Sequence, residues 1–264
     1  MSSHPYARYV AVGDSRTEGL GDGDERRGYR GWADRLAEIL AAGRPDFAYA
    51  NLAVRGRLTE QVKDEQLGPA LALKPDLVTV VAGVDDLVGP GYDAARTARA
   101  MEEMFAELTG AGARVVTVTF PDIGRIAPLA RSAKARVVDL NARVRAAADR
   151  HGVVVLDLFP LRITADPRLW CRDRMHASPV GHARIAAAVA DALGIAGHAD
   201  WARPLPPLAP VTTLGEAAQE VRWLAGAVGP WVRRRMRLPV VGGAGRSAKR
   251  PVLDAVTLPE GARP

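Results

Sequence analysis

The stretch VAVGDSRTEG, Val10 to Gly19, passes from a run of small and β-branched apolar residues directly into Gly13-Asp14-Ser15. The apolar run is typical of a buried strand, and Gly, Asp and Ser all favour turns. Ser15 therefore follows a predicted strand, either as an ordinary turn residue or as a nucleophile. Because a nucleophilic serine needs a general base, the rest of the chain decides between the two.

Short runs rich in β-branched residues predict four buried strands and a weaker fifth. They cover Tyr9–Val12, Leu77–Ala82, Arg114–Thr119, Val153–Leu156 and, more weakly, Phe47–Leu52. Helical patterns lie between them, at Gly31–Ala42, Leu58–Leu73, Tyr92–Thr109, Ser132–Arg150 and Pro179–Leu193. This alternation predicts a three-layer α/β fold, with helices on both faces of a parallel sheet of about five strands. In such sheets, ligand sites lie beyond the carboxyl ends of the strands.

The composition is that of an ordinary globular protein, with 48% apolar and 25% charged residues in a chain of 264. The single cysteine, Cys171, excludes an internal disulfide, and no apolar run approaches the roughly 18 residues of a membrane span. The N-terminus lacks the pattern of a secretory signal. We therefore expect a cytoplasmic location.

The C-terminal part has a different composition. A Pro-rich segment, Ala202–Pro210, follows the last predicted helix, so we predict a domain over residues 1–198 and a Pro-linked, helical and basic extension over residues 199–264. The helix of this extension is predicted over Leu214–Ala227. Much of the net charge of +6 comes from a basic cluster comprising Arg233, Arg234, Arg235, Arg237, Arg246, Lys249 and Arg250.

The preferred interpretation of the basic cluster is a solvated extension. Docking onto the protein's own acidic surface or a second subunit, and peripheral contact with anionic surfaces, stay open as alternatives. A nucleic-acid partner is not expected, because the excess charge belongs largely to the extension rather than to the domain. The sequence does not specify the oligomeric state.

A candidate base for Ser15 lies in the stretch CRDRMHASPVGH, Cys171 to His182. It contains Asp173 and His176, three residues apart, in a segment with Pro and Gly before a predicted helix. On a loop, this spacing lets the carboxylate meet Nδ1 of the imidazole and leaves Nε2 for the serine. Donors for an oxyanion are expected at the ends of other strands.

Four blocks occur in order along the chain: Gly13-Asp14-Ser15, Asn51 to Gly56, Gly83-Val84-Asp85-Asp86, and Asp173-x-x-His176. Together they resemble the SGNH, or GDSL-type, hydrolases over about residues 8–195. Further matches to that family are Thr17, Glu18, Gly19, Ser178, Pro179, Gly181 and His182.

The resemblance implies a flavodoxin-like sheet and hydrolysis of a small-molecule ester without a metal or cofactor. It implies Ser15 as the nucleophile, His176 as the base and Asp173 as the group that orients the base. The oxyanion hole would comprise Ser15, Gly56 and the polar residue of the third block, Asp85. Supporting roles fall to Asp14, Asn51 and Asp86.

One block departs from the family pattern. The family has Asn where this chain has Asp85, and an ionised carboxylate accepts hydrogen bonds but cannot donate them. Asp85 is therefore protonated, or turned away, or it weakens the enzyme. Asp85 leaves open the alternative of a ligand-binding protein that has lost turnover. Independently of Asp85, an acyltransferase is a second alternative to a hydrolase. The expected substrate is an ester with a small or medium acyl group.

Overall fold

The computed structural model describes residues 4–89, 91–207, 223, 225–226 and 245–258. Its centre is a six-stranded sheet in the order β7-β6-β5-β1-β4-β8. The parallel strands are β1 (Arg8–Gly13), β4 (Ala48–Asn51), β5 (Leu77–Val81), β6 (Arg114–Val118) and β7 (Val154–Leu156). Numbered along the chain, these five lie in the order 2-1-3-4-5, which is the flavodoxin-like arrangement. The predicted fold class is confirmed.

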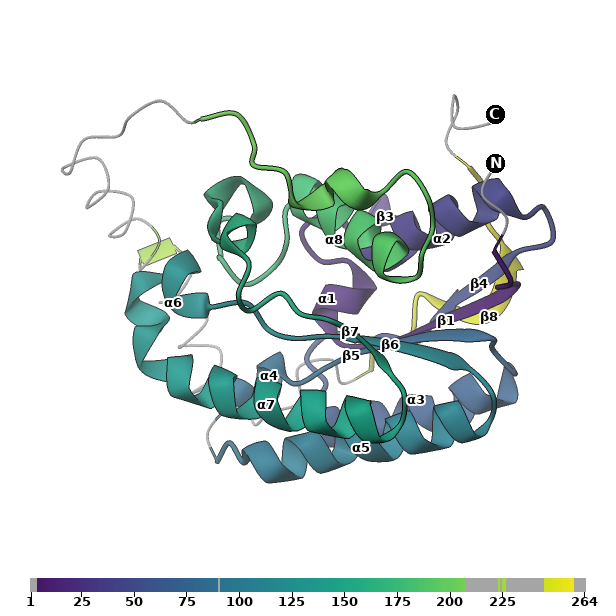
Figure 1. Cartoon of the computed structure of the whole chain (residues 1–264), viewed down its shortest axis with the longest axis horizontal. Coiled ribbons are helices and arrows are strands. Elements are labelled where there is room, and N and C mark those ends of the chain that lie inside the picture. The colour runs from purple at the N-terminus through teal and green to yellow at the C-terminus, as the bar shows by residue number, and fades with distance from the viewer. Residues whose placement is uncertain (1–3, 90, 208–222, 224, 227–244, 259–264) are drawn as a thin grey trace.

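Helices cover both faces of the sheet, as Figure 1 shows. One face carries α2 (Trp32–Gly43) and α8 (Pro179–Ala192), and the other carries α3 (Thr59–Ala72), α5 (Ala94–Gly110) and α7 (Lys134–Arg150). The single-turn helices are α1 (Ser15–Glu18), α4 (Val84–Leu87) and α6 (Ile123–Ile126). In the described ranges, no helix has both the length and the apolar content needed to cross a bilayer.

The remaining elements are short. A hairpin is formed by β2 (Gly23–Asp24) and β3 (Gly28–Tyr29). The 3-10 helices are η1 (Pro128–Ala133), η2 (Arg162–Ala165), η3 (Pro167–Leu169) and η4 (Ala199–Ala202).

Alternation along β1 explains why the sheet needs helices on both sides. Val10 and Val12 pack into the core beneath α3, α5 and α7, whereas Tyr9 and Ala11 pack into the core shared with α2 and α8. All four side chains are buried. Successive strand residues point to opposite faces, so a strand apolar at every position is stable only between two layers.

The sixth strand, β8 (Arg250–Ala255), was not predicted. It pairs antiparallel with β4 at the edge of the sheet. Residues 250–255 therefore belong to the sheet of the main domain rather than to a separate extension. The predicted helix over residues 214–227 and the arginines at 233–237 lie outside the described residues, apart from positions 223, 225 and 226.

The described residues of the basic cluster contact the domain. Arg246 pairs with Glu25, and the Lys249 Nζ lies 2.6 Å from an oxygen of Asp34. The Arg250 guanidinium lies 5.3 Å from the centre of a tyrosine ring in β4. For Lys249 and Arg250 the preferred interpretation of a solvated extension is wrong, because the domain covers most of each side chain. Arg246 stays exposed.

Candidate active site

Ser15 begins α1 directly beyond the end of β1. The backbone of Gly13 has φ of 157°, and a Cβ at this position would stand 2.3 Å from the carbonyl oxygen of Val81 on β5. Asp14 is the N-cap of α1, and its side chain accepts a hydrogen bond of 3.0 Å from the Arg16 N–H. The turn thus requires Gly at position 13 and uses Asp14 as a cap, and it places Ser15 at the carboxyl edge of the sheet.

His176 joins two side chains into what we call the candidate triad. Its Nε2 lies 2.9 Å from the Ser15 Oγ, and its Nδ1 lies 2.6 Å from the Asp173 Oδ2. In this geometry the carboxylate favours the tautomer with a proton on Nδ1, which leaves Nε2 able to accept the hydroxyl proton. The structure therefore brings Ser15, His176 and Asp173 together.

Both oxygens of Asp173 are used. Oδ1 accepts the backbone N–H groups of Met175 at 2.9 Å and His176 at 3.0 Å, while Oδ2 holds the imidazole. Burial acts to raise the pKa of Asp173, but its hydrogen bonds and the neighbouring imidazole lower the pKa more, and the net pKa is below the ordinary value. An ionised Asp173 is the form that can accept a hydrogen bond from the Nδ1–H group.

The loop after β4 is fastened to α1. The amide nitrogen of Asn51, which is fully buried, donates to the Thr17 carbonyl oxygen over 2.9 Å, and its oxygen accepts from the Ala53 N–H over 3.1 Å. Glu18 accepts from the Arg55 N–H over 2.7 Å and also forms an ion pair with the Arg55 guanidinium. Asn51 therefore orders this loop against the Ser15 helix.

The backbone N–H groups of Ser15 and Gly56 are the candidate donors to an oxyanion. Gly56 directly follows Arg55 and has φ of 77°, in the left-handed region that favours glycine. Neither the Gly56 N–H nor the Ser15 N–H has an acceptor among the residues that the structure describes. Such N–H groups are available to donate to charge that develops on a substrate oxygen.

α4 carries two neighbouring carboxylates, Asp85 and Asp86, which have different surroundings. Asp86 is buried, and its Oδ2 accepts from both the N–H and the hydroxyl of Thr59, each over 2.9 Å. Asp86 thus ties α4 to the start of α3. Asp85 is half-buried, and burial together with the charge of Asp85 raises the pKa of Asp14 to about 7. The carboxyl group of Asp85 therefore lies close enough to Asp14 for the two groups to influence each other's ionisation.

Arg16 is a candidate that the sequence analysis missed. Its Nε donates to the carbonyl oxygen of Met175 over 3.3 Å, and its guanidinium lies 5.3 Å from the centre of the Phe120 ring. Burial lowers the pKa of Arg16, and the charges of three carboxylates oppose that shift: Asp14, Asp85 and Asp173. The available signal was a charged residue inside an otherwise buried turn, because the side chains on either side of it are buried.

Trp223 belongs to the predicted C-terminal helix and contacts the loop of the candidate triad. Its indole N–H donates to the Asp173 carbonyl oxygen over 3.2 Å, and the Arg174 guanidinium lies 4.7 Å from the centre of a Trp223 ring. The C-terminal region therefore reaches the loop that carries the acid and the base.

His182 is buried among backbone groups. Its Nδ1 accepts from the Trp32 N–H and its Nε2 donates to the Leu20 carbonyl oxygen, both over 3.0 Å. Burial lowers the pKa of His182 to about 4, so the ring is neutral at neutral pH. Within the described ranges, no group of three or more His, Cys, Asp or Glu side chains is arranged to hold a metal ion.

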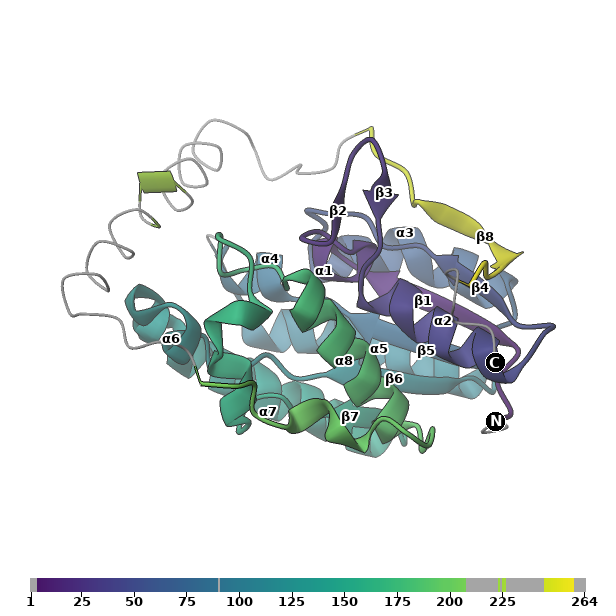
Figure 2. The same cartoon turned by 90° about the horizontal axis from the view of Figure 1, so that it is seen from above.

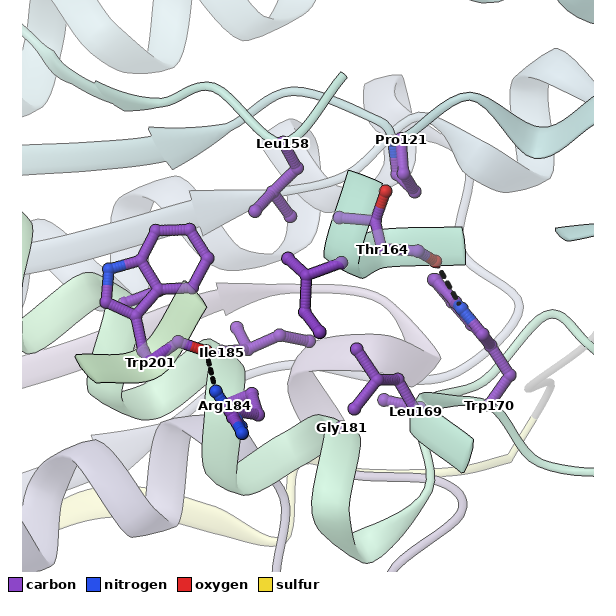
Figure 3. Close-up of a pocket in the computed structure, with 12 residues that line it drawn as sticks. Pro121, Leu158, Thr164, Leu169, Trp170, Gly181, Arg184, Ile185 and Trp201 are labelled. Atoms are coloured by element: carbon purple, nitrogen blue, oxygen red, sulfur yellow. Dashed lines mark hydrogen bonds between the residues drawn. The ribbon is translucent and has the colours of Figure 1, made fainter. Parts of the chain in front are cut away.

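An apolar cavity of about 40 Å³ lies beside the loop. Figure 3 shows Trp170 and Trp201 on opposite sides of this cavity, with apolar side chains between them. The Trp170 indole N–H donates to the Thr164 carbonyl oxygen over 2.7 Å. The lining includes Ala177 but no member of the candidate triad. The cavity thus adjoins the loop without opening directly on the serine.

Comparison with protein families gives a match over residues 11–184, which is more than half of the chain, to the GDSL-like lipase/acylhydrolase family. The chain belongs to this family. Membership supports ester hydrolysis in general, and it confirms the resemblance seen in the four sequence blocks. A comparison with curated proteins gives no significant match.

Several solved structures have the same fold. A lipase/acylhydrolase from Enterococcus faecalis is 23% identical with a TM-score of 0.58, over 77% of this chain and 100% of that one. An alpha/beta hydrolase enzyme from the metagenome of Lake Arreo is 21% identical with a TM-score of 0.60, over 74% and 97%. An acetylxylan esterase from Geobacillus stearothermophilus is 16% identical with a TM-score of 0.59, over 73% and 95%.

Proposed function

We propose that this GDSL-family protein hydrolyses carboxylic esters through an acyl-serine intermediate, with Ser15 as nucleophile, His176 as base and Asp173 as the group that orients the base. The Ser15 Oγ forms a bond to the ester carbonyl carbon while its proton moves to the His176 Nε2. The carbonyl oxygen becomes an oxyanion, and the N–H groups of Ser15 and Gly56 donate to it.

The tetrahedral intermediate then collapses. The carbonyl forms again, the bond to the alcohol oxygen breaks, and the His176 imidazolium gives its proton to the departing alcohol. Water attacks the acyl-serine in the second half of the reaction, with His176 taking a proton from that water and returning it to the Ser15 Oγ. Asp173 stabilises the imidazolium in both halves and stays ionised throughout.

Two successive hydrogen bonds carry this proposal. The Ser15 Oγ lies 2.9 Å from the His176 Nε2, and the His176 Nδ1 lies 2.6 Å from the Asp173 Oδ2. Ser15 and His176 come from segments far apart in sequence, so a local turn does not explain why their side chains meet. The family match supports the same chemistry. We expect small or medium acyl groups, and the acetylxylan esterases among the structural relatives support including acetate esters in the test.

The test is hydrolysis of p-nitrophenyl esters from acetate to palmitate by the wild type, Ser15→Ala and Ser132→Ala. Ser132 is an exposed serine in η1 and serves as the matched control. Removal of a triad serine should lower kcat/KM by roughly 10³–10⁶-fold, whereas the control should keep wild-type activity. The chain-length profile then gives the size of the acyl group that the site accepts.

Other outcomes would favour the alternatives. Ligand binding without Ser15-dependent turnover of any ester would support a binding protein. A new ester, formed when an alcohol acceptor is added and seen by product analysis, would support an acyltransferase.

A further inference from the structure

Residues 245–258 lie at the edge of the sheet beside the candidate active site. In β8, Arg250 pairs with Asn51 of β4, the residue that holds the loop against α1. Figure 2 shows β8, in yellow, next to β4 and close to the β2–β3 hairpin. The residue directly before β8 is Lys249, and its side chain turns toward the helix of Ser15.

The Lys249 ammonium bonds to three acceptors from three different elements. Its Nζ lies 2.6 Å from the Glu18 carbonyl oxygen at the end of α1, 2.9 Å from the Tyr29 carbonyl oxygen in β3, and 2.6 Å from the Asp34 Oδ2 in α2. An ammonium has three donors, so all of its protons are used. The Lys249 side chain is only 22% exposed, which strengthens such charge-assisted bonds.

α1 depends on hydrogen bonds from outside side chains to its backbone carbonyl groups, because it is a single turn. A one-turn helix has almost no hydrogen-bond ladder of its own, and its last carbonyl groups have no partner within the helix. Two side chains from outside supply those partners. The Asn51 amide donates to the Thr17 carbonyl oxygen, and the Lys249 ammonium donates to the Glu18 carbonyl oxygen.

Glu18 also connects Lys249 to the second oxyanion donor. Its carbonyl oxygen accepts from Lys249, and its carboxylate accepts from the N–H and the guanidinium of Arg55. Gly56 is the next residue along the chain. A shift of Glu18 would therefore move both Ser15 and the Gly56 N–H.

We propose that Lys249 is a positioning residue, which fixes the Ser15 helix and, through Glu18, the Gly56 loop. The family match ends at residue 184. Lys249 thus lies outside the residues that the family model matches. Its kinetic consequence rests on the proposed esterase function, whereas its effect on the helix does not.

A clean test must separate Lys249 from Asp34. Replacing Lys249 alone would leave Asp34 without its cation, and burial already raises the pKa of Asp34. We therefore compare Asp34→Asn with the double variant Asp34→Asn/Lys249→Met, both in the full chain. The control is Lys63→Met, which removes a lysine of similar exposure that lies 2.8 Å from a glutamate on α5.

Hydrogen exchange tests the helix without any need for catalysis. The N–H groups of Gly19 and Leu20 both donate to the Ser15 carbonyl oxygen over 3.1 Å, so they report opening of α1. We expect their exchange to be at least about fivefold faster in the double variant than in Asp34→Asn, and unchanged in Lys63→Met. Equal exchange in the double variant and Asp34→Asn would overturn the proposal, whether or not the protein is an esterase.

Kinetics test the consequence for the reaction. With p-nitrophenyl acetate, we expect kcat of the double variant to be about 10- to 100-fold below that of Asp34→Asn, with KM changed less than about twofold, because misplacement of reacting groups acts on the chemical step. Assays are run well below the unfolding temperature of each variant. Faster exchange with an unchanged kcat would overturn the positioning role.

Discussion

Arg16 and Met175 are joined by a hydrogen bond of 3.3 Å, from the guanidinium Nε to the backbone carbonyl oxygen. Arg16 directly follows Ser15, and Met175 directly precedes His176. This bond therefore links the two segments whose side chains meet at the candidate triad. The guanidinium also supplies positive charge close to three carboxylates, which are Asp14, Asp85 and Asp173.

We predict that Arg16→Gln lowers kcat for p-nitrophenyl acetate by about tenfold or more, because both the link to Met175 and the compensating charge are lost. The negative charges that remain would oppose an oxyanion on the substrate. The control is Arg145→Gln, which removes a partly exposed arginine that pairs with Asp157 over 2.6 Å. An Arg16→Gln enzyme with the wild-type kcat would contradict a role for this side chain in the reaction.

Asp85→Asn tests the departure from the family pattern. An amide can donate a hydrogen bond to the oxyanion, whereas an ionised carboxylate repels it. One such donor is worth on the order of 10²–10³ in rate, so we expect kcat to rise by up to about 10²-fold. The same change removes one of the two causes that raise the pKa of Asp14, and that pKa should fall below about 7.

The comparison for this experiment is Asp85→Ala, which removes the charge without adding a donor. A rise specific to the asparagine variant would identify the amide as the active feature. A large fall in turnover with Asp85→Asn would show instead that the carboxylate contributes to activity in this enzyme.

The fold was predictable where burial on both faces forces a strong pattern. β5, with sequence LVTVV, is buried at every position, and four of its five residues are aliphatic. β8 was missed because its sequence, RPVLDA, contains proline and charges, and all of its residues are exposed or half-buried. Such composition suits an edge strand, which needs hydrogen bonds on one side only, but it equally suits a loop.

The residues of the candidate triad were predictable from the sequence, but the contacts that surround them were not. Asp173 and His176 are three residues apart, so a loop alone brings them together, and the predicted strand ends indicated where Ser15 would lie. Arg16 and Met175 are 159 positions apart, and Lys249 is 231 positions from Glu18. No spacing within one sequence indicates such contacts, because they depend on the path of loops that carry no periodic signal.

Gly13→Ala should destabilise the protein. A Cβ at Gly13 would stand 2.3 Å from the Val81 carbonyl oxygen and 2.6 Å from the Thr17 Oγ1, so β1, β5 or α1 would have to move. We expect a loss of about 3 kcal/mol or more in the free energy of unfolding, measured by urea denaturation. The control is Gly110→Ala at the end of α5, where nothing lies within 4 Å of the added Cβ. That change should be neutral or stabilising by up to about 1 kcal/mol, and equal losses in the two variants would contradict the steric argument.

His182 should make stability fall on acidification. Its pKa is lowered from 6.5 to about 4 by burial, so the folded protein resists a proton that the unfolded chain accepts. Its contribution is present above pH 6.5 and is lost as the pH falls toward 4, by about 2 kcal/mol between pH 7 and pH 5. His182→Gln loses the two hydrogen bonds of the buried ring, so its free energy of unfolding should be lower than that of the wild type at pH 7. Because glutamine does not titrate, this gap should narrow by about the same 2 kcal/mol at pH 5. Urea denaturation of both proteins at the two pH values measures the gap, and an equal gap at both would show that His182 does not set this pH dependence.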